Sequence, residues 1–422
     1  MADKNSTIPR GWKMTTLGEV VDIKGGKRLP MGKSLVVQKT SHPYIRITDI
    51  ENNKIKKNQL QFITDDVFSS ISRYIVNSGD VIVSIVGSIG FVAIIDDDLD
   101  KASLTENCVK FVNLKNLDSK FLYYFLTSGS GQNEIERNTI GAVQKKLPIY
   151  GVQNIKIFLP SFPEQRAIAA VLSSLDDKIE LLREQNKTLE AIAQAIFKEW
   201  FVNFNFPGAT GKMIDSELGE IPEGWRVGGL IEDSISEFVK TNIDKFDGTK
   251  DYVETANVNL SNFVGNFEKI TYEERASRAN MQPVANSIWF ARMAESRKYL
   301  LFQERDWQNI ETKILSTGFA GIRCIKDYLY FYWCFILSNT FNNLKNQFAE
   351  GAVQVAISNE GIQRILLALP PKEIVQKFTE TVSSCFEKIS NNNSQIQTLS
   401  ALRDTLLPKL MKGEVRVKGF KD

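Results

Sequence analysis

The chain has 422 residues, of which 43% are hydrophobic and 24% charged, and its formal net charge is +2 at pH 7. These values are typical of a globular protein with two or three domains, and they exclude a uniformly basic protein that coats nucleic acid without sequence preference. No apolar run reaches the roughly 18 residues of a membrane span, and the N-terminus lacks a signal-peptide core, so we expect a cytoplasmic protein with no membrane partner.

The first part of the chain has the pattern of a mixed α+β unit. Short β-branched runs at 44–50, 81–86, 91–95 and 108–114 predict strands, and 118–128 predicts a helix. Basic and polar side chains stand on the loops between these strands. Arginine and lysine can bind guanine or phosphate, and serine can donate or accept, so the loops favour DNA contacts. The DNA-binding residues predicted here are Lys27, Arg28, Arg46, Ser84, Ser88 and Lys145. The alternative is that these are turn residues without a ligand.

A long helix is predicted to follow, over 163–201. Apolar residues recur there with heptad spacing, and about 39 helical residues would extend roughly 58 Å, more than a small domain needs. Asn186 interrupts the apolar seam and could fix the helix register. Several large apolar residues of this helix are candidates for a surface that a partner covers: Ile192, Phe197, Trp200 and Phe201. We expect this helix to pair with a second one as a spacer.

The same plan returns about 210 residues later. Ile8-Pro9-Arg10-Gly11-Trp12 reappears as Ile221-Pro222-Glu223-Gly224-Trp225, and Gly141-Ala142-Val143-Gln144 as Gly351-Ala352-Val353-Gln354. Strands are predicted at 287–291, 299–302 and 321–325, an aromatic-rich helix at 327–341, and a second heptad helix over 378–410 that Asn391-Asn392-Asn393 interrupts. The aromatic cluster predicts core, with a base-stacking platform as the alternative. The DNA-binding residues predicted in this half are Arg292, Ser296, Arg297 and Lys298.

The fold prediction is α+β, with two duplicated globular domains separated by two long helices that form an antiparallel, pseudo-twofold symmetric coiled coil. The expected domain boundaries are 1–160 for the first globular domain, 161–205 for the first spacer helix, 206–370 for the second globular domain and 371–422 for the second helix with the tail.

No motif predicts catalysis or a metal site. The sole histidine is His42, and the four cysteines lack metal-ligand spacing. Gly32-Lys33-Ser34 lacks the first glycine of a phosphate-binding loop, and no methyltransferase motif occurs. We therefore expect no cofactor on this chain.

Three features of the sequence resemble the specificity subunit of type I restriction-modification systems. They are the duplicated plan, the Gly-Ala-Val-Gln motif ahead of Leu-Pro, and a helix that opens with Pro163-Glu164-Gln165-Arg166 and contains Leu175-Asp176-Asp177-Lys178-Ile179. The resemblance implies a non-catalytic reader of double-stranded DNA, in which each globular domain recognises half of a split site and the helices fix the gap. It also implies two modification (methyltransferase) subunits and restriction (translocase and nuclease) subunits as partners, with S-adenosylmethionine, ATP and Mg²⁺ bound by those partners.

Two rival functions remain at this point. A duplicated protein-interaction scaffold would use the same architecture without binding DNA. A stand-alone nuclease or methyltransferase would need an active site that the sequence motifs do not reveal.

Overall fold

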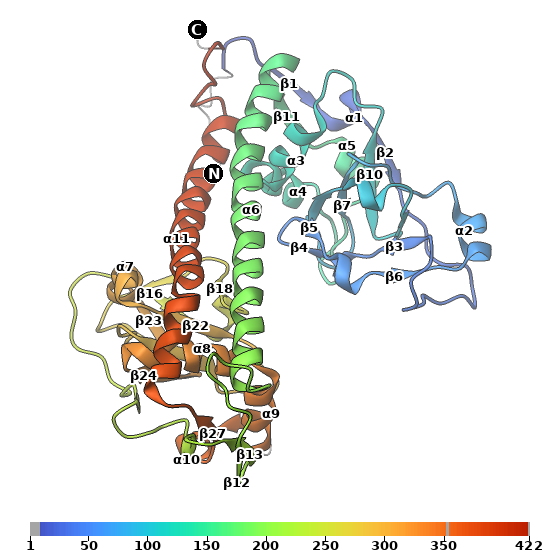
Figure 1. Cartoon of the computed structure of the whole chain (residues 1–422). Helices are drawn as coiled ribbons and strands as arrows, with labels where there is room; N and C mark the ends of the chain where they lie inside the picture. The colour runs from blue at the N-terminus through green and yellow to red at the C-terminus, as the bar shows by residue number, and fades with distance from the viewer. Residues whose placement is uncertain (1–8, 352–353, 421–422) are drawn as a thin grey trace. The chain divides into compact units, whose positions relative to one another are not determined.

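The structure is a computed structural model that describes residues 9–351 and 354–420 (Figure 1). The chain divides into two compact units: unit 1 comprises Met1–Glu180 with Gln397–Asp422, and unit 2 comprises Leu181–Ile396. Three landmarks of the predicted repeat, Ile8, Ala352 and Val353, lie outside the described residues. Each unit contains one globular part and one segment of each long helix.

The main sheet of unit 1 has four antiparallel strands in the order β2-β10-β7-β8. They are β2 (Asp22–Gly25), β10 (Cys108–Val112), β7 (Val81–Ser84) and β8 (Val92–Ile94). Valine and isoleucine dominate β7 and β8 because branched side chains suit an extended, buried backbone. Helix α3 (Ser119–Thr127) begins where Asp118 accepts a hydrogen bond from the Phe121 amide, and it packs on this sheet. The core therefore lies between α3 and the sheet.

The other elements of unit 1 are short helices, two strand pairs and a small three-stranded sheet. They are α1 (Leu17–Val20), α2 (Asp65–Ile71), α4 (Gly129–Arg137), α5 (Ile149–Gln153), the β1 (Lys13–Thr16) and β11 (Lys156–Leu159) pair, the β6 (Gln61–Phe62), β3 (Pro43–Ile45) and β9 (Ser103–Leu104) sheet, and the β4 (Ile50–Glu51) and β5 (Lys54–Ile55) hairpin.

Unit 2 repeats this topology. Its main sheet has the order β15-β24-β21-β22, and its β14-β27 pair corresponds to β1-β11. The strands of the main sheet are β15 (Ser236–Phe238), β24 (Phe319–Cys324), β21 (Ser287–Ala291) and β22 (Tyr299–Phe302), and the pair consists of β14 (Arg226–Gly229) and β27 (Leu366–Leu369). A second four-stranded sheet contains, in order, β19 (Glu268–Ile270), β16 (Lys250–Val253), β23 (Lys313–Ser316) and β20 (Ala279–Met281). Three further pairs are β17 (Val258–Asn259) with β18 (Asn262–Phe263), β12 (Met213–Ser216) with β13 (Gly219–Pro222), and β25 (Ala349–Glu350) with β26 (Ala356–Ile357). The helices are α7 (Trp307–Thr312), α8 (Leu329–Leu337), α9 (Asn339–Gln347) and α10 (Asn359–Gln363).

Backbone hydrogen bonds outside the sheets also repeat. The Ile85 amide donates to the Asn107 carbonyl at 2.8 Å in unit 1, and the Arg292 amide donates to the Gly318 carbonyl at 2.9 Å in unit 2. The Ile85 carbonyl also accepts a hydrogen bond from the Leu147 amide, and the Arg292 carbonyl accepts one from the Ile357 amide. Leu147 and Ile357 each lie just ahead of a short helix. The duplication predicted from sequence landmarks is thus present in the local folding of each unit.

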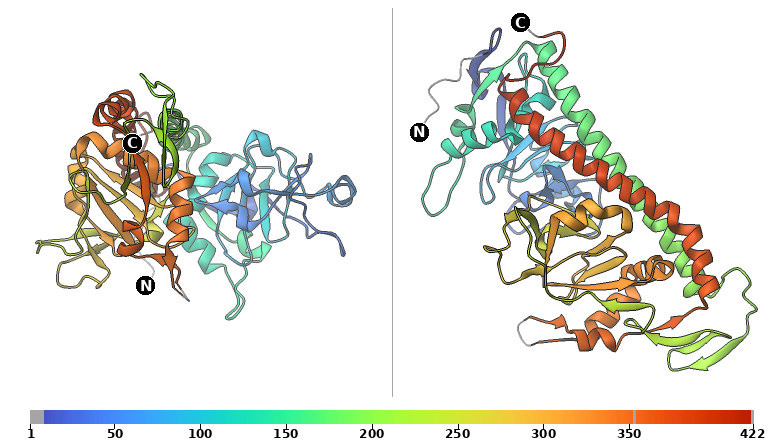
Figure 2. Two further views of the ribbon diagram at one scale, coloured as in Figure 1. Left: turned by 60° about the horizontal axis from the view of Figure 1, so that its bottom comes forward. Right: turned by 90° about the vertical axis from the view of Figure 1, so that its left-hand side faces the viewer.

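The two long helices are α6 (Phe162–Phe201) and α11 (Lys372–Met411), each of 40 residues. They pair in antiparallel fashion, because Asp176 of α6 bonds to Arg403 of α11 in unit 1, and Asn186 bonds to Asn393 in unit 2 (Figures 1 and 2). The mixed α+β fold and the long helices agree with the prediction. The structure does not test the predicted domain boundaries or the pseudo-twofold symmetry.

The three consecutive asparagines do not interrupt α11, so that prediction is wrong. Asn392 is fully buried, and its amide donates to the Asn186 side chain at 2.8 Å. The Asn186 amide donates to Asn393 at 2.7 Å. The amide groups of Asn186 and Asn392 thus have partners across the helix pair, and the helix continues through the asparagines.

Three further predictions need correction. The run 44–50 is not one strand, because a helical turn at Ile47–Asp49 separates β3 from β4. The helix expected over 327–341 is two helices, because Ser338 ends α8 and caps α9. Phe197 and Phe201 do not form an uncovered surface, since both are buried against Phe378 in unit 2.

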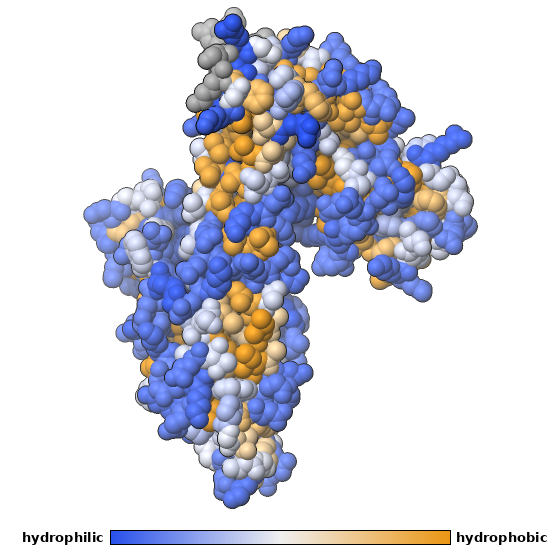
Figure 3. All heavy atoms as spheres, turned by 45° about the horizontal axis from the view of Figure 1, so that its top comes forward, coloured by the Kyte–Doolittle hydropathy of each residue, from blue (hydrophilic) through white to orange (hydrophobic). Residues whose placement is uncertain are grey.

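The aromatic residues of α8 belong to the core, as expected, because Leu329 to Ile336 are all buried. Exposed apolar side chains do remain on the long helices, and the face in Figure 3 carries several hydrophobic patches between hydrophilic groups. The exposed apolar side chains of the long helices include Leu181 and Ile192 on α6 and Leu402 on α11.

Candidate DNA-reading groove

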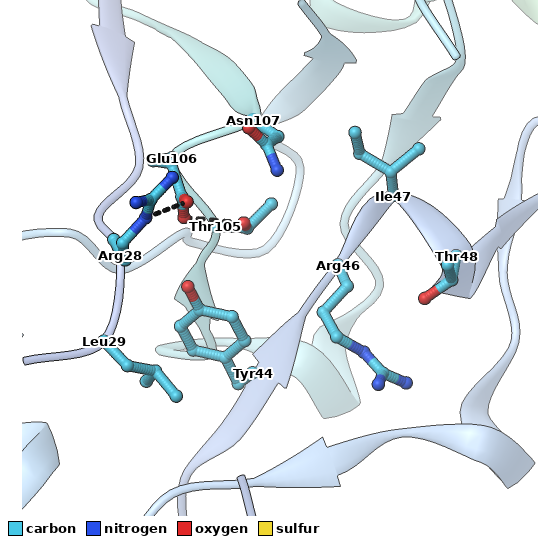
Figure 4. Close-up of a pocket in the computed structure, with 9 residues that line it drawn as sticks. All are labelled: Arg28, Leu29, Tyr44, Arg46, Ile47, Thr48, Thr105, Glu106 and Asn107. Carbon is cyan, nitrogen blue, oxygen red and sulfur yellow. Dashed lines mark hydrogen bonds and ion pairs between the residues drawn. The ribbon is translucent and has the colours of Figure 1, made fainter. Parts of the chain in front are cut away.

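An open groove in unit 1 brings several predicted site residues together. Its volume is about 470 Å³, and Figure 4 shows its lining. The lining comes from three loops: Arg28 and Leu29 after β2, Tyr44 with Arg46 to Thr48 at the end of β3, and Thr105 to Asn107 between β9 and β10. The β3-β9 strand pairing brings the second and third of these loops together, so the sheet itself positions the groove.

Arg28 and Glu106 form an ion pair at the groove. The Arg28 Nε donates to the Glu106 carboxylate at 2.7 Å, and the arginine side chain is 80% exposed. This hydrogen bond raises the pKa of Arg28. Burial is the largest influence on the pKa of Glu106 and raises it, but the hydrogen bonds from Arg28, a backbone amide and Thr105, together with the Arg28 charge, outweigh burial, so the pKa is lowered. Both groups are therefore charged at neutral pH.

Arg46 lines the same groove, but its guanidinium is engaged within the protein. It donates to both Asp49 carboxylate oxygens, at 3.0 and 2.7 Å, and also to Gln61 and the Gln59 carbonyl. Figure 4 shows the side chain directed away from Arg28 and Glu106. Arg46 therefore stabilises the turn after β3, and this conformation does not favour the predicted base contact.

The two predicted serines of unit 1 differ in accessibility. Ser84 is fully buried, and its hydroxyl accepts from the Phe91 amide at 2.9 Å and donates to the Ser88 carbonyl. It closes the turn between β7 and β8 and cannot reach DNA in this conformation, which corrects its predicted role. Ser88 stands exposed on that turn.

The predicted lysines of unit 1 are both exposed. Lys27 precedes Arg28, and its ammonium lies 5.7 Å from the centre of the Tyr74 ring. Its carbonyl accepts a hydrogen bond from the Tyr44 hydroxyl at 2.7 Å, which fixes the backbone beside Arg28. Lys145 stands on the exposed loop ahead of α5, and it forms no ion pair with another described residue. Both lysines can approach phosphate groups.

In unit 2, two of the predicted basic residues hold the fold together. The Arg292 guanidinium donates to the Phe319 carbonyl at 3.3 Å, the Ile357 carbonyl at 3.1 Å and the Asn359 side chain at 2.7 Å. Burial lowers the pKa of Arg292. Lys298 donates to the Thr255 carbonyl at 2.6 Å. The expectation that Arg292 reads a base therefore loses its support.

The other two candidates of unit 2 lie on the loop between β21 and β22. Arg297 is exposed, and within residues 9–351 and 354–420 its side chain forms no ion pair. Ser296 is half-buried, and its carbonyl accepts a hydrogen bond from the buried Lys345. This loop is thus anchored from inside while Arg297 faces solvent.

Sequence reasoning missed Tyr44, Glu106 and Asn107 as groove residues. DNA contacts were predicted from basic and hydroxyl side chains, and a Thr-Glu-Asn turn between two strands does not by itself indicate DNA binding. Strand pairing could have found them only after β9 was recognised, and β9 has two residues.

The described residues contain no cluster of three or more potential metal ligands. His42 stacks on Phe68 with ring centres 3.8 Å apart, and its Nε2 lies 3.0 Å from Asp65. Burial raises the pKa of the Cys108 thiol to about 12, which keeps it protonated and unreactive. In the part of the chain that the structure describes, no helix is both long and apolar enough to cross a membrane.

The fold and the groove define a class of duplicated α+β proteins with paired long helices. Residues 9–191 match the family model described as the type I restriction modification DNA specificity domain. This match and the relatives confirm the predicted resemblance of the chain to type I specificity subunits.

Relatives extend the similarity along the chain. The MjaIX specificity subunit of Methanocaldococcus jannaschii is 27% identical, over 97% of this chain and 95% of the relative. The HindI specificity subunit of Haemophilus influenzae is 21% identical, over 88% of this chain and 94% of the relative. The crystal structure of an M. genitalium type I S subunit is similar with a TM-score of 0.55 and 17% identity, over 97% of this chain and 98% of that one, which supports the fold.

Proposed function

We propose that this chain is the DNA-reading subunit of a type I restriction-modification complex, in which each globular domain binds one half of a bipartite DNA site. The observation that carries the proposal is the duplication: two units share a topology and a set of backbone hydrogen bonds, but differ in the side chains on their loops. A common frame with different loop residues suits two half-sites of different sequence.

The proposal assigns three kinds of role to the domains expected from the sequence. Residues 1–160 and 206–370 read DNA, the helices within 161–205 and 371–422 set the gap between half-sites, and the exposed apolar residues of these helices contribute to partner docking. Exposed Lys27, Lys145 and Arg297 approach phosphates, which fixes the orientation of each domain on the duplex.

The chemistry belongs to partner subunits in this proposal. Two modification subunits bind S-adenosylmethionine and methylate adenine, and restriction subunits use ATP and Mg²⁺ to translocate and cleave DNA. This chain supplies sequence recognition, and the assembly acts in the cytoplasm.

The decisive experiment is to co-express the full chain with its modification subunit and map methylated adenines in the host DNA by single-molecule sequencing. A split motif with a fixed gap is the expected result. A stable complex of the two proteins that neither methylates nor shifts any duplex would contradict the proposal and favour the scaffold function, whose association would be insensitive to DNA.

A further inference from the structure

The Arg28–Glu106 pair presents a guanidinium that is oriented but still available. Its bond to Glu106 uses Nε, and the side chain remains 80% exposed. The two terminal amino groups of Arg28 form no hydrogen bond within residues 9–351 and 354–420. These amino groups can donate in parallel to two acceptors, which is the geometry of a bidentate contact.

Both partners of the pair stand on a fixed backbone. The Tyr44 hydroxyl binds the carbonyl of Lys27, directly before Arg28. The Lys27 amide donates to the Leu104 carbonyl of β9, two residues before Glu106. Thr105 donates to the second oxygen of Glu106 at 3.1 Å. The arginine is thus held in position before any ligand arrives, which reduces the entropy lost on binding.

The carboxylate distinguishes this arginine from a phosphate anchor. Glu106 would repel a phosphate that approached Arg28, and the ion pair has no net charge to release counterions from DNA. A base edge carries only partial charges and suffers no such repulsion. Guanine offers the O6 and N7 acceptors that match two parallel arginine donors in the major groove.

We infer that Arg28 reads a guanine in the half-site bound by unit 1, and that Glu106 is the residue that positions it. This inference rests on the proposed function and names the base chemistry of one groove. Arg28 is the specificity-determining group, and Glu106 acts through it.

The matching place in unit 2 lacks the carboxylate. Gly318 takes the position of Asn107, as the repeated hydrogen bonds from Ile85 and Arg292 show, so Thr317 takes the position of Glu106. Unit 2 therefore has no carboxylate at this point to orient an arginine. The guanine contact positioned by a glutamate is therefore assigned to the half-site of unit 1.

The test uses the complex of the full chain with its modification subunit and measures binding to duplexes that carry each base at every position of the wild-type site. Arg28→Ala should reduce the preference for guanine at one position of one half-site by about 10- to 100-fold. The other positions and the second half-site should keep their preferences. The salt dependence of binding should stay unchanged, because no phosphate contact is lost.

Glu106→Gln tests the positioning role. It should weaken the guanine preference at the same position while raising the affinity for unrelated duplexes, because a negative charge beside the DNA is removed. A residue with only a structural role would lower both together. Glu106→Asp should recover part of the guanine preference, because it restores the charge.

Arg137→Ala is the matched control. Arg137 is also an exposed arginine of unit 1 paired with a glutamate, Glu134, at 2.8 Å, but it stands on α4 outside the groove. It should leave every base preference unchanged. Exposed ion pairs contribute little stability, so both arginine variants should fold.

Two results would overturn the inference while the proposed function stands. One is an Arg28→Ala complex with the wild-type preference at every position. The other is an equal loss on all duplexes with a reduced salt dependence, which would identify a phosphate contact. Failure of the wild-type complex to discriminate between any duplexes would instead overturn the proposed function itself.

Discussion

Helix α6 begins in unit 1 and helix α11 begins in unit 2. The two helix starts share a backbone arrangement, but the buried side chains there are polar in unit 1 and apolar in unit 2. In unit 1, the Glu164 side chain is 2% exposed and accepts two hydrogen bonds from Arg416, at 2.9 and 2.8 Å. The neighbouring Gln165 donates to the Pro160 carbonyl and accepts from the Asp118 amide. In unit 2, the corresponding residues are Ile374 and Val375, which pack in the hydrophobic core.

A second difference lies under the loop between the third and fourth strands of each main sheet. In unit 2, Lys345 is fully buried and donates to the Ser296 carbonyl. In unit 1, Ile135 takes the equivalent place on α4, and Gln132 instead donates to the Gly90 carbonyl at 3.0 Å. The loop is held to its helix in both units, by a different donor in each.

These pairs show which features the duplicated fold requires. Strand order, helix starts and the backbone hydrogen bonds of the frame are kept, whereas a buried polar network in one unit is an apolar contact in the other. Buried ion pairs can often be replaced as a whole by apolar packing without loss of stability, although removal of one partner is costly. Each difference between the units therefore makes a separate prediction.

The largest effect is expected for Arg416→Ala. This substitution leaves the buried Glu164 carboxylate without its bidentate partner, so unit 1 should lose about 3 to 5 kcal/mol of unfolding free energy. The chain has two units, so hydrogen exchange of α3 peptides by mass spectrometry is the suitable measurement.

Two variants sharpen this prediction. Arg403→Ala breaks a pair with Asp176 whose members are 30% and 26% exposed, and it should cost about 1 kcal/mol. The double variant Glu164→Ile, Arg416→Met replaces the ion pair with apolar packing, with the isoleucine of unit 2 at the helix start, and should recover most of the lost stability. If Arg416→Ala changes exchange no more than Arg403→Ala does, the pair is not a requirement of unit 1.

The next effect concerns the polar layer between α6 and α11 in unit 2. Asn186→Leu would remove the partner that Asn392 and Asn393 share, and the fully buried Asn392 would keep only the long contact to Gln185 at 3.4 Å, so we expect a loss of about 2 kcal/mol. Hydrogen exchange of unit 2 measures it. Asn391→Leu changes the same residue type on an exposed face of α11, and it should stay within about 0.5 kcal/mol of wild type.

The double variant Asn186→Leu, Asn392→Leu separates stability from register. It should restore stability, because no buried amide remains unpaired, but it removes the group that distinguishes one helix register from another. Methylation mapping should then show a less uniform gap between half-sites. An unchanged gap and association state would contradict the register role.

The sequence was sufficient for the architecture because the architecture depends on repeated, local signals. Heptad spacing predicted α6 to within one residue of its start, Phe162, and the strands predicted at 287–291 and 299–302 from the repeat have the observed bounds of β21 and β22. The asparagines of α11 misled because Asn392 and Asn393 bind the side chain of Asn186, about 206 residues away in the sequence. Periodicity contains no information about such a distant partner.

The candidate site was also less predictable because its contacts join residues that are distant in the sequence. Residue type alone placed Arg28, Arg46 and Arg292 in one category. The contacts separate these three: Arg46 and Arg292 bind carbonyls and side chains of their own unit, whereas Arg28 keeps its terminal donors exposed. Whether an arginine faces a ligand depends on tertiary partners, which short-range patterns do not reveal.

The smallest effect is expected at Lys345, and it depends on pH. Burial lowers the pKa of Lys345 to about 8 from the ordinary 10.5, the Glu295 carboxylate raises it, and Arg297 lowers it further. Between about pH 7 and 9 the folded chain loses this proton while the unfolded chain keeps it, so the stability of unit 2 should rise by about 1 kcal/mol across this range.

Lys345→Ile places the residue of unit 1 in unit 2 and isolates this contribution. The variant loses the hydrogen bond to Ser296 at every pH, and the difference in unfolding free energy between wild type and variant should grow in favour of wild type from about pH 7 to 9. Hydrogen exchange of α9 at matched intrinsic rates measures this difference. A difference that does not change with pH would mean that Lys345 titrates outside this range, and the two units would then differ in packing alone.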